Sequence, residues 1–197
     1  MSLVSRLTMI LSDQKFDMGK VFGIGLQKTG TTSLMFALQK LGYKTKHFVP
    51  KLVCKNHSGG EIAPQGCEFH PEEVNIDIAH NYDALVDNPL PFPSVYKELA
   101  FAFPKAKFVL TTRPIDGWVQ SVMSHIDQKY YKVILAERVK KYNNYDPYLD
   151  IVYSCDNMGV LEYLYKKPYA KIDKKSIEQC YKSHHKKVKK MFVKIGF

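Results

Sequence analysis

The chain has few cysteines and no long apolar run, and both shortages narrow what it can be. Its 197 residues contain four cysteines, scattered rather than packed into a disulfide framework, which favours a reducing compartment. The apolar stretch near the N-terminus is too short and too interrupted to span a bilayer, and it lacks a small-residue cleavage site. We therefore expect a cytoplasmic protein that does not insert into a membrane.

Acidic residues are also scarce. The chain has 19 Asp and Glu against 29 Lys and Arg, and the formal net charge is +10. Much of the excess lies between Lys132 and Lys190, without an RNA- or DNA-binding signature around it. We therefore expect no nucleic-acid partner, because electrostatic steering of a multiply anionic ligand explains the charge. A carboxylate-rich magnesium site and a Ser/His/Asp triad order are absent as well.

Length and composition indicate one globular domain. The hydrophobic fraction of 45% and the chain length suffice for a single substantial core. We assign residues 20–197 to this domain and residues 1–19 to an N-terminal extension or leader. Internal repeats and low-complexity linkers are not found.

The stretch KVFGIGLQKTGTTSLMFALQKLG, residues 20–42, is the most informative part of the chain. Residues 21–24 suit a short buried strand, residues 25–30 form a glycine-bounded loop, and apolar residues recur at helical spacing from there to a glycine cap. Strand, loop and helix N-terminus together make an anion site, because backbone N–H groups and the positive end of the helix dipole point at its occupant. Hydroxyl groups add further donors at Thr29, Thr31, Thr32 and Ser33.

The position of the lysine in this loop distinguishes it from the Walker A pattern. Gly25 and Gly30 have the Walker spacing, but Thr31 stands where that pattern has its lysine, and the lysine is inside the loop at Lys28. The segment QKTGTTS closely resembles the PKxGTT-type loop of sulfotransferases, which bind the 5′-phosphosulfate of 3′-phosphoadenosine 5′-phosphosulfate (PAPS). The resemblance implies that the cofactor is bound by Gln27, Lys28, Thr29, Gly30, Thr31, Thr32 and Ser33.

A second match lies further along the chain. The apolar segment KFVLTT, residues 107–112, predicts a strand that ends at Arg113, and the following PIDGWVQSV leads to Ser121 on the next helix. Sulfotransferases have an Arg and a Ser at these two places, and both hold the 3′-phosphate of PAPS. The resemblance therefore assigns Arg113 and Ser121 to that phosphate, whereas each residue alone would be interpreted as an ordinary surface group.

Asp87 is the best-placed candidate base. It follows the short apolar strand predicted at 84–86, and ligands of open parallel sheets bind outside the carboxyl ends of the strands. Family members carry a catalytic His or Glu in the corresponding region, so this chain departs from them by offering Asp87. An aspartate is a weak base and would need partial desolvation to take a proton from an alcohol. The competing interpretations are that Asp87 caps the turn into NPLP and that His80 is the base.

Two Cys/His pairs could hold a structural zinc ion. Cys54 with His57 and Cys67 with His70 have suitable spacings, and the loop between them could be stapled by a metal. The same segment also corresponds to a variable, acceptor-facing insertion of sulfotransferases. We assign no metal to the reaction itself.

The predicted order of elements defines the fold class. Strands alternating with helices imply an α/β fold with three α/β/α layers and a mainly parallel sheet, and the resemblance implies the P-loop NTPase-like sulfotransferase fold. The family's late strand and basic glycine-containing segment have no recognisable counterpart before Phe197, and Trp118 is interpreted as a core residue. We predict strands at 20–25, 84–87 and 107–112, helices at 31–41, 71–80, 93–103 and 116–126, an irregular segment at 44–70, and mostly helices from 128 onward.

The resemblance implies transfer of a sulfuryl group from PAPS to a hydroxyl or amine of a small molecule or carbohydrate, releasing adenosine 3′,5′-bisphosphate. Lys28 would stabilise the leaving phosphate oxygen, and Asp87 would orient or deprotonate the acceptor. The alternatives are a P-loop kinase that phosphorylates a small molecule with ATP and magnesium, and a non-catalytic nucleotide-binding module. The acceptor and the oligomeric state are not encoded in these motifs.

Overall fold

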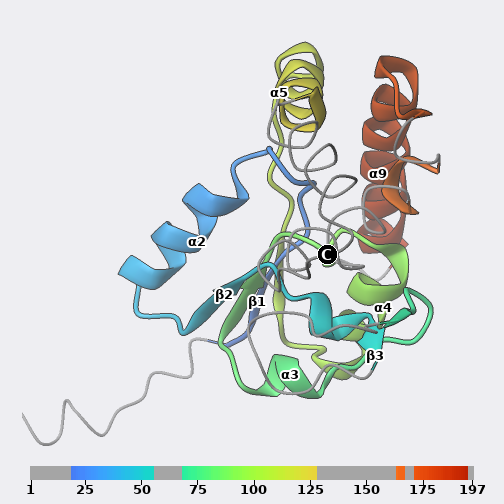
Figure 1. Cartoon of the computed structure of the whole chain (residues 1–197). Helices are drawn as coiled ribbons and strands as arrows, with labels where there is room; N and C mark the ends of the chain where they lie inside the picture. The colour runs from blue at the N-terminus through green and yellow to red at the C-terminus, as the bar shows by residue number, and fades with distance from the viewer. Residues whose placement is uncertain (1–18, 56–67, 128–162, 167–170, 195–197) are drawn as a thin grey trace, which may run out of the picture.

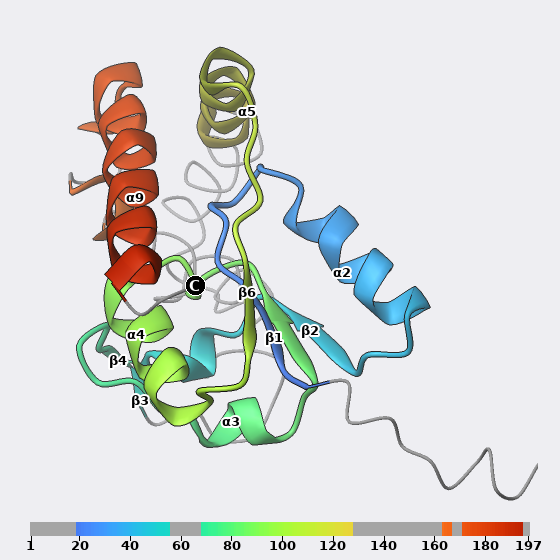
Figure 2. The same cartoon turned by 180° about the vertical axis from the view of Figure 1, so that it is seen from behind.

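The computed structural model describes residues 19–55, 68–127, 163–166 and 171–194, and in this part of the chain it contains one parallel sheet. The sheet has the order β2 (Thr45–His47), β5 (Ala84–Val86), β1 (Val21–Gly23), β6 (Lys107–Val109). In the centre, Val21 of β1 lies opposite Ala84 on one side and Lys107 on the other. Parallel strands need crossover connections, and helices supply them here (Figures 1 and 2). The expected α/β class with a parallel sheet is confirmed.

Helices follow the strands of the sheet. Directly after β1 and its loop comes α2 (Thr31–Lys40), and α4 (Pro93–Ala102) connects β5 to β6. The helix α5 (Ile115–Asp127) stands beside the long α9 (Lys174–Lys194) in both views (Figures 1 and 2). The remaining elements are short: the 3-10 turn Pro50–Leu52, the antiparallel pair of β3 (Cys54–Lys55) with β4 (Glu68–Phe69), and α3 (Asp77–His80).

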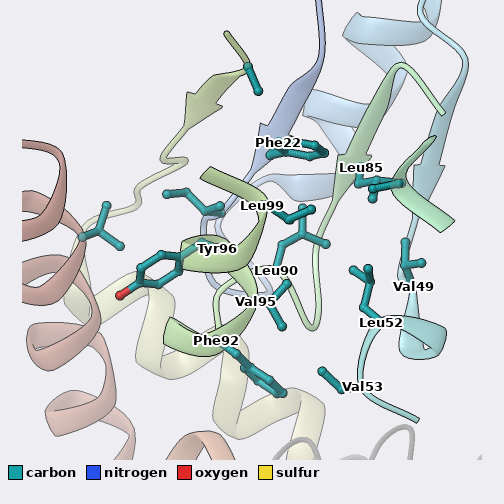
Figure 3. Packing of buried hydrophobic residues seen from close by; sticks show 14 residues of the cluster. Phe22, Val49, Leu52, Val53, Leu85, Leu90, Phe92, Val95, Tyr96 and Leu99 are labelled. Carbon is teal, nitrogen blue, oxygen red and sulfur yellow. The ribbon is translucent and has the colours of Figure 1, made fainter. Parts of the chain in front are cut away.

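Alternate residues of the central strands bury their side chains on opposite faces of the sheet. Val21 and Val86 pack with Leu38 of α2 on one face. On the other face, Phe22 and Leu85 pack with residues of α4, as Figure 3 shows for Val95, Tyr96 and Leu99. Burying each of these large side chains contributes roughly 1.5–3 kcal/mol to stability. The sheet is therefore covered by helices on both faces.

A separate cluster of buried residues joins α5 to α9. Trp118 and Val122 of α5 are fully buried against Ile177 of α9 and Leu26 of the loop after β1. Trp118 also donates a hydrogen bond of 2.8 Å from Nε1 to the backbone oxygen of Gln27. The interpretation of Trp118 as a core residue is confirmed, and the same side chain holds the loop in place.

Most predicted elements around the two motifs are confirmed, with ends that shift by up to three residues. The prediction of an irregular or insertion segment at 44–70 is wrong where this segment contributes the strand β2 to the sheet, and it also missed the short pair of β3 with β4. Thr45, Lys46 and His47 are polar and half-exposed, so neither an apolar run nor an alternation reveals this edge strand. The helix predicted at 71–80 is reduced to the last four of its residues. Of the helices predicted from 128 onward, α9 lies in the described part of the chain, and much of the rest lies outside it.

None of the helices in the described ranges combines the length and the apolar character needed to cross a membrane.

Candidate functional site

A cleft with a volume of about 560 Å³ opens at the carboxyl ends of the parallel strands. It brings together residues from the loop after β1, the ends of β2 and β5, the segment after β6, and α5. The lining residues are Gln27, Lys28, Gly30, Thr31, Thr32, His47, Phe48, Asp87, Asn88, Arg113, Ser121 and His125. The sequence-predicted residues Lys28, Asp87, Arg113 and Ser121 therefore share one cleft, whereas Thr29 and Ser33 are not among its lining residues.

The loop after β1 leads into an open helix N-terminus. Lys28 and Gly30 have left-handed backbone conformations, with φ of +65° and +102°, and Gly30 is the N-cap of α2. No side chain caps this helix, and its first turn carries no acidic residue. The N–H groups at the start of α2 are thus left for an outside acceptor, and the helix dipole favours an anion there.

The loop is packed directly against the residues that follow β6. A Cβ atom on Gly25 would lie 1.9 Å from Oγ1 of Thr111, so only glycine fits at this position. The Oγ1 atoms of Thr29 and Thr111 are 2.7 Å apart, and the Thr29 hydroxyl also donates a hydrogen bond of 2.5 Å to the backbone oxygen of Leu26. Thr29 therefore uses its side chain to hold the loop together and to join the first motif to the second.

The side-chain amide of Gln27 is bonded at both ends within the protein. Its Oε1 accepts a hydrogen bond of 2.9 Å from Nδ2 of Asn88, and its Nε2 donates one of 3.1 Å to the hydroxyl of Tyr165. All three residues are buried. Gln27 thus ties the loop to the end of β5 and to the segment that precedes α9.

Asp87 lies at the end of β5 with a left-handed backbone conformation, φ +73°. Its Oδ2 is 3.1 Å from Nε2 of His47, which lies at the end of the neighbouring strand β2. Burial raises the pKa of Asp87, and four neighbours oppose this only in part: the His47 ring, the Asn88 backbone N–H, the Lys28 charge and the Thr31 hydroxyl. The desolvation that the sequence analysis required of a base is therefore present at Asp87.

His47 is one of the cleft residues that sequence reasoning missed. Its Nε2 lies 3.4 Å from Oγ1 of Thr31 and 3.5 Å from Oγ1 of Thr32, so the ring adjoins the start of α2 as well as Asp87. Its position at the end of a strand beside β5 could have identified it, but only if Thr45–His47 had been recognised as a strand. Asn88 and His125 were missed for a similar reason, since neither belongs to a motif.

Arg113 and Ser121 line the cleft from the segment after β6 and from α5. The hydroxyl of Tyr181 on α9 donates a hydrogen bond of 2.5 Å to the backbone oxygen of Arg113, which fixes the chain where it leaves the sheet. Ser121 and His125 are four residues apart on α5 and therefore share one face of that helix. Burial and the nearby Lys28 lower the pKa of His125, which favours its neutral form.

His80, the alternative candidate for the base, lies away from the cleft. His80 ends α3, before β5 begins, and its ring packs on Phe103 with centroids 4.9 Å apart. It is not a lining residue of the cleft, so the structure does not support it as a base.

Within the described ranges no group of three or more potential metal-binding side chains occurs. His57 and Cys67 lie outside those ranges, and the zinc interpretation stays a prediction.

Comparison with known proteins identifies the family. Residues 20–195 match the model of the sulfotransferase domain. A stretch of 111 residues is 32% identical to "Ava biosynthesis cluster protein M" of Aspergillus versicolor, which covers 53% of this chain and 42% of that protein. The chain thus spans less than half of the length of this relative. Since the family model covers almost the whole chain, the protein belongs to the sulfotransferase family.

Proposed function

We propose that this protein transfers a sulfuryl group from PAPS to a hydroxyl or amine of a small-molecule or carbohydrate acceptor. The observation that carries the proposal is the convergence of the Lys28 loop and the Arg113–Ser121 pair on one cleft. The two motifs come from different parts of the chain, and each supplies donors suited to an anion. A ligand with two separate phosphate groups fits this arrangement better than a ligand with one.

The donors that line the cleft are of the kinds that bind phosphate groups. The uncapped N-terminus of α2, with Thr31 and Thr32 in its first turn, would hold the 5′-phosphate together with Lys28. Arg113 and Ser121 would hold the 3′-phosphate. The buried side chains of Gln27 and Thr29 would act on the cofactor by keeping the loop in shape. When bound, PAPS supplies a sulfuryl group on a phosphate that is a good leaving group.

Sulfuryl transfer requires mainly that the two reactants be positioned and that the negative charge on the leaving group be neutralised. Lys28 is exposed to the cleft from inside the loop, where its ammonium group would stabilise the negative charge that develops on the leaving phosphate oxygen. Asp87, partly desolvated at the end of β5, would contribute to the deprotonation of the acceptor. We assign no metal to this reaction, because Lys28 supplies a positive charge at the site.

A kinase using ATP and magnesium is the alternative that Asp87 at the end of β5 would favour, since an acidic residue at such a strand end can bind a metal ion. Two features weigh against it. Thr31 stands in place of the Walker lysine, and ATP has no 3′-phosphate to occupy Arg113 and Ser121.

The proposed function is tested by measuring whether the protein transfers labelled sulfur or labelled phosphate to an acceptor. The protein is incubated with PAPS labelled at sulfur and a panel of phenols, alcohols, amines and sugars, and in parallel with ATP labelled at the γ-phosphate and magnesium. We expect labelled sulfur in at least one acceptor, at a rate reduced at least tenfold by Arg113→Ala and unchanged by Lys40→Ala at the far end of α2. Transfer of labelled phosphate in place of sulfur would assign the protein to the kinases.

A further inference from the structure

The carboxylate of Asp87 is poorly placed to meet an acceptor directly. Its Oδ1 is buried without a hydrogen-bond partner among the described residues, and its Oδ2 faces Nε2 of His47 at 3.1 Å. About 13% of the Asp87 side chain is exposed, against 27% of the His47 side chain. Both side chains line the cleft, and the imidazole is the more exposed of the two.

The pairing also decides which ring nitrogen is left to react. An N–H at Nε2 can donate to Oδ2 of Asp87, and in that neutral tautomer the lone pair for a proton is on Nδ1. A carboxylate that fixes the tautomer and orientation of a histidine base is a known arrangement in other enzymes. Thr31 and Thr32 lie near the same nitrogen, so the ring is held at the start of α2.

We propose that His47 is the general base that takes the proton from the acceptor, and that Asp87 is its positioning residue. This inference rests on the proposed sulfuryl transfer. Nδ1 of His47 takes the proton of the acceptor hydroxyl as the hydroxyl oxygen bonds to sulfur. The bond between sulfur and the phosphate oxygen breaks, and its electron pair leaves with the phosphate. The second proton of the ring stays between Nε2 and Asp87, which stabilises the imidazolium, and Nδ1 then releases its proton to water.

The first test separates base catalysis from a structural role. Rates are measured for His47→Gln, for Asp87→Asn and for the control His80→Gln, with acceptors that range from the acidic 4-nitrophenol to weakly acidic phenols and alcohols. A base matters most when the acceptor is a weak acid. We expect His47→Gln to lose about 10²–10⁴-fold with the weakest acids and less than about tenfold with 4-nitrophenol. Asp87→Asn should follow the same trend, and His80→Gln should be unaffected.

A second pair of measurements does not depend on enzymatic turnover. Nitrogen NMR of the protein with labelled histidine should show the His47 ring as the tautomer protonated at Nε2, and Asp87→Asn should weaken that preference. Calorimetry should show that His47→Gln binds adenosine 3′,5′-bisphosphate as wild type does.

The outcomes are distinguishable. An active wild type whose rates fall equally for all acceptors in His47→Gln, or do not fall at all, overturns the role of His47 and leaves the proposed function standing. A wild type that transfers no sulfur contradicts the proposed function. Whatever the activity, a ring protonated at Nδ1 overturns the inference, because that tautomer is incompatible with a base held by Asp87 through Nε2.

Discussion

Asn88 donates a hydrogen bond of 2.9 Å to the side-chain oxygen of Gln27, and this buried contact joins the end of β5 to the loop after β1. The same amide of Gln27 continues to Tyr165. One side of the cleft is therefore held by a network of side chains that do not themselves carry charge. The arrangement makes the loop's geometry depend on residues far from it in sequence.

Breaking the hydrogen bond between Asn88 and Gln27 should destabilise the folded protein. In Asn88→Leu the buried Oε1 of Gln27 loses its donor, and leaving such a group unsatisfied costs about 1–3 kcal/mol. Urea unfolding of Asn88→Leu, Gln27→Met and the double variant would measure the coupling. We expect the double variant to lose less than the sum of the two single losses. Strictly additive losses would show that the contact contributes nothing.

Gly25 should tolerate no side chain. A Cβ atom there would lie 1.9 Å from Oγ1 of Thr111 and 2.7 Å from its backbone oxygen, and the backbone cannot move aside as a side chain can. We expect Gly25→Ala to lower the free energy of unfolding by about 3 kcal/mol or more. The control is Gly117→Ala in α5, whose Cβ would meet Nε of Arg113 at an ordinary 3.6 Å. That variant should gain up to about 1 kcal/mol from helix propensity. A Gly25→Ala protein as stable as wild type would contradict the packing.

His184 should make the protein less stable in mild acid. It is buried on α9, and its Nε2 donates to the backbone oxygen of Ile24 at 2.8 Å. Burial lowers its pKa to about 4, from an ordinary value of 6.5. Between these two values the unfolded chain binds a proton that the folded protein does not, so stability falls as the pH falls through this window.

This shift in the pKa of His184 should lower the free energy of unfolding by up to about 3 kcal/mol once the pH is below both values. Thermal unfolding between pH 7 and pH 4 would measure it, with His184→Gln expected to flatten the profile. His80→Gln is the control, since His80 is exposed and its loss should leave the slope intact. An unchanged slope in His184→Gln would show that other groups cause the acid sensitivity.

Lys28 should matter more for turnover than for binding. Its charge is proposed to act on the leaving phosphate oxygen, where charge develops only during transfer. We expect Lys28→Ala to reduce kcat by at least about 10²-fold while the dissociation constant of adenosine 3′,5′-bisphosphate rises less than about tenfold. Lys40→Ala, on the same helix but outside the cleft, provides the matched control. A Lys28→Ala protein with unchanged turnover would remove Lys28 from the mechanism.

Three of the four strands of the sheet, β1, β5 and β6, and one side of the cleft were predictable because their signals are local. Apolar runs marked β1 and β5, and the two motifs then predicted that Lys28 and Arg113 would meet at the carboxyl ends of the strands. The strand β2 was not predictable in this way. Its polar residues are ordered by pairing with β5, with Lys46 opposite Leu85, and this contact is not visible in a run of three residues.

His47 escaped the sequence prediction because the strand β2 did. His47 lies beside Asp87 only because β2 and β5 are parallel neighbours, in a register that places it opposite Val86. The contact between Gln27 and Asn88 has the same origin. Both depend on tertiary proximity between segments that carry no shared sequence pattern, so they become visible only once the fold is known.

The most direct test of the account is a calorimetric titration of wild type and Arg113→Ala with adenosine 3′,5′-bisphosphate, ADP, and ATP with and without magnesium. We predict that wild type binds the bisphosphate more tightly than ADP, that magnesium does not change this, and that Arg113→Ala removes the preference by losing the partner of the 3′-phosphate. Equal binding of the bisphosphate and ADP, or tighter binding of ATP with magnesium, would contradict the assignment of this cleft to PAPS.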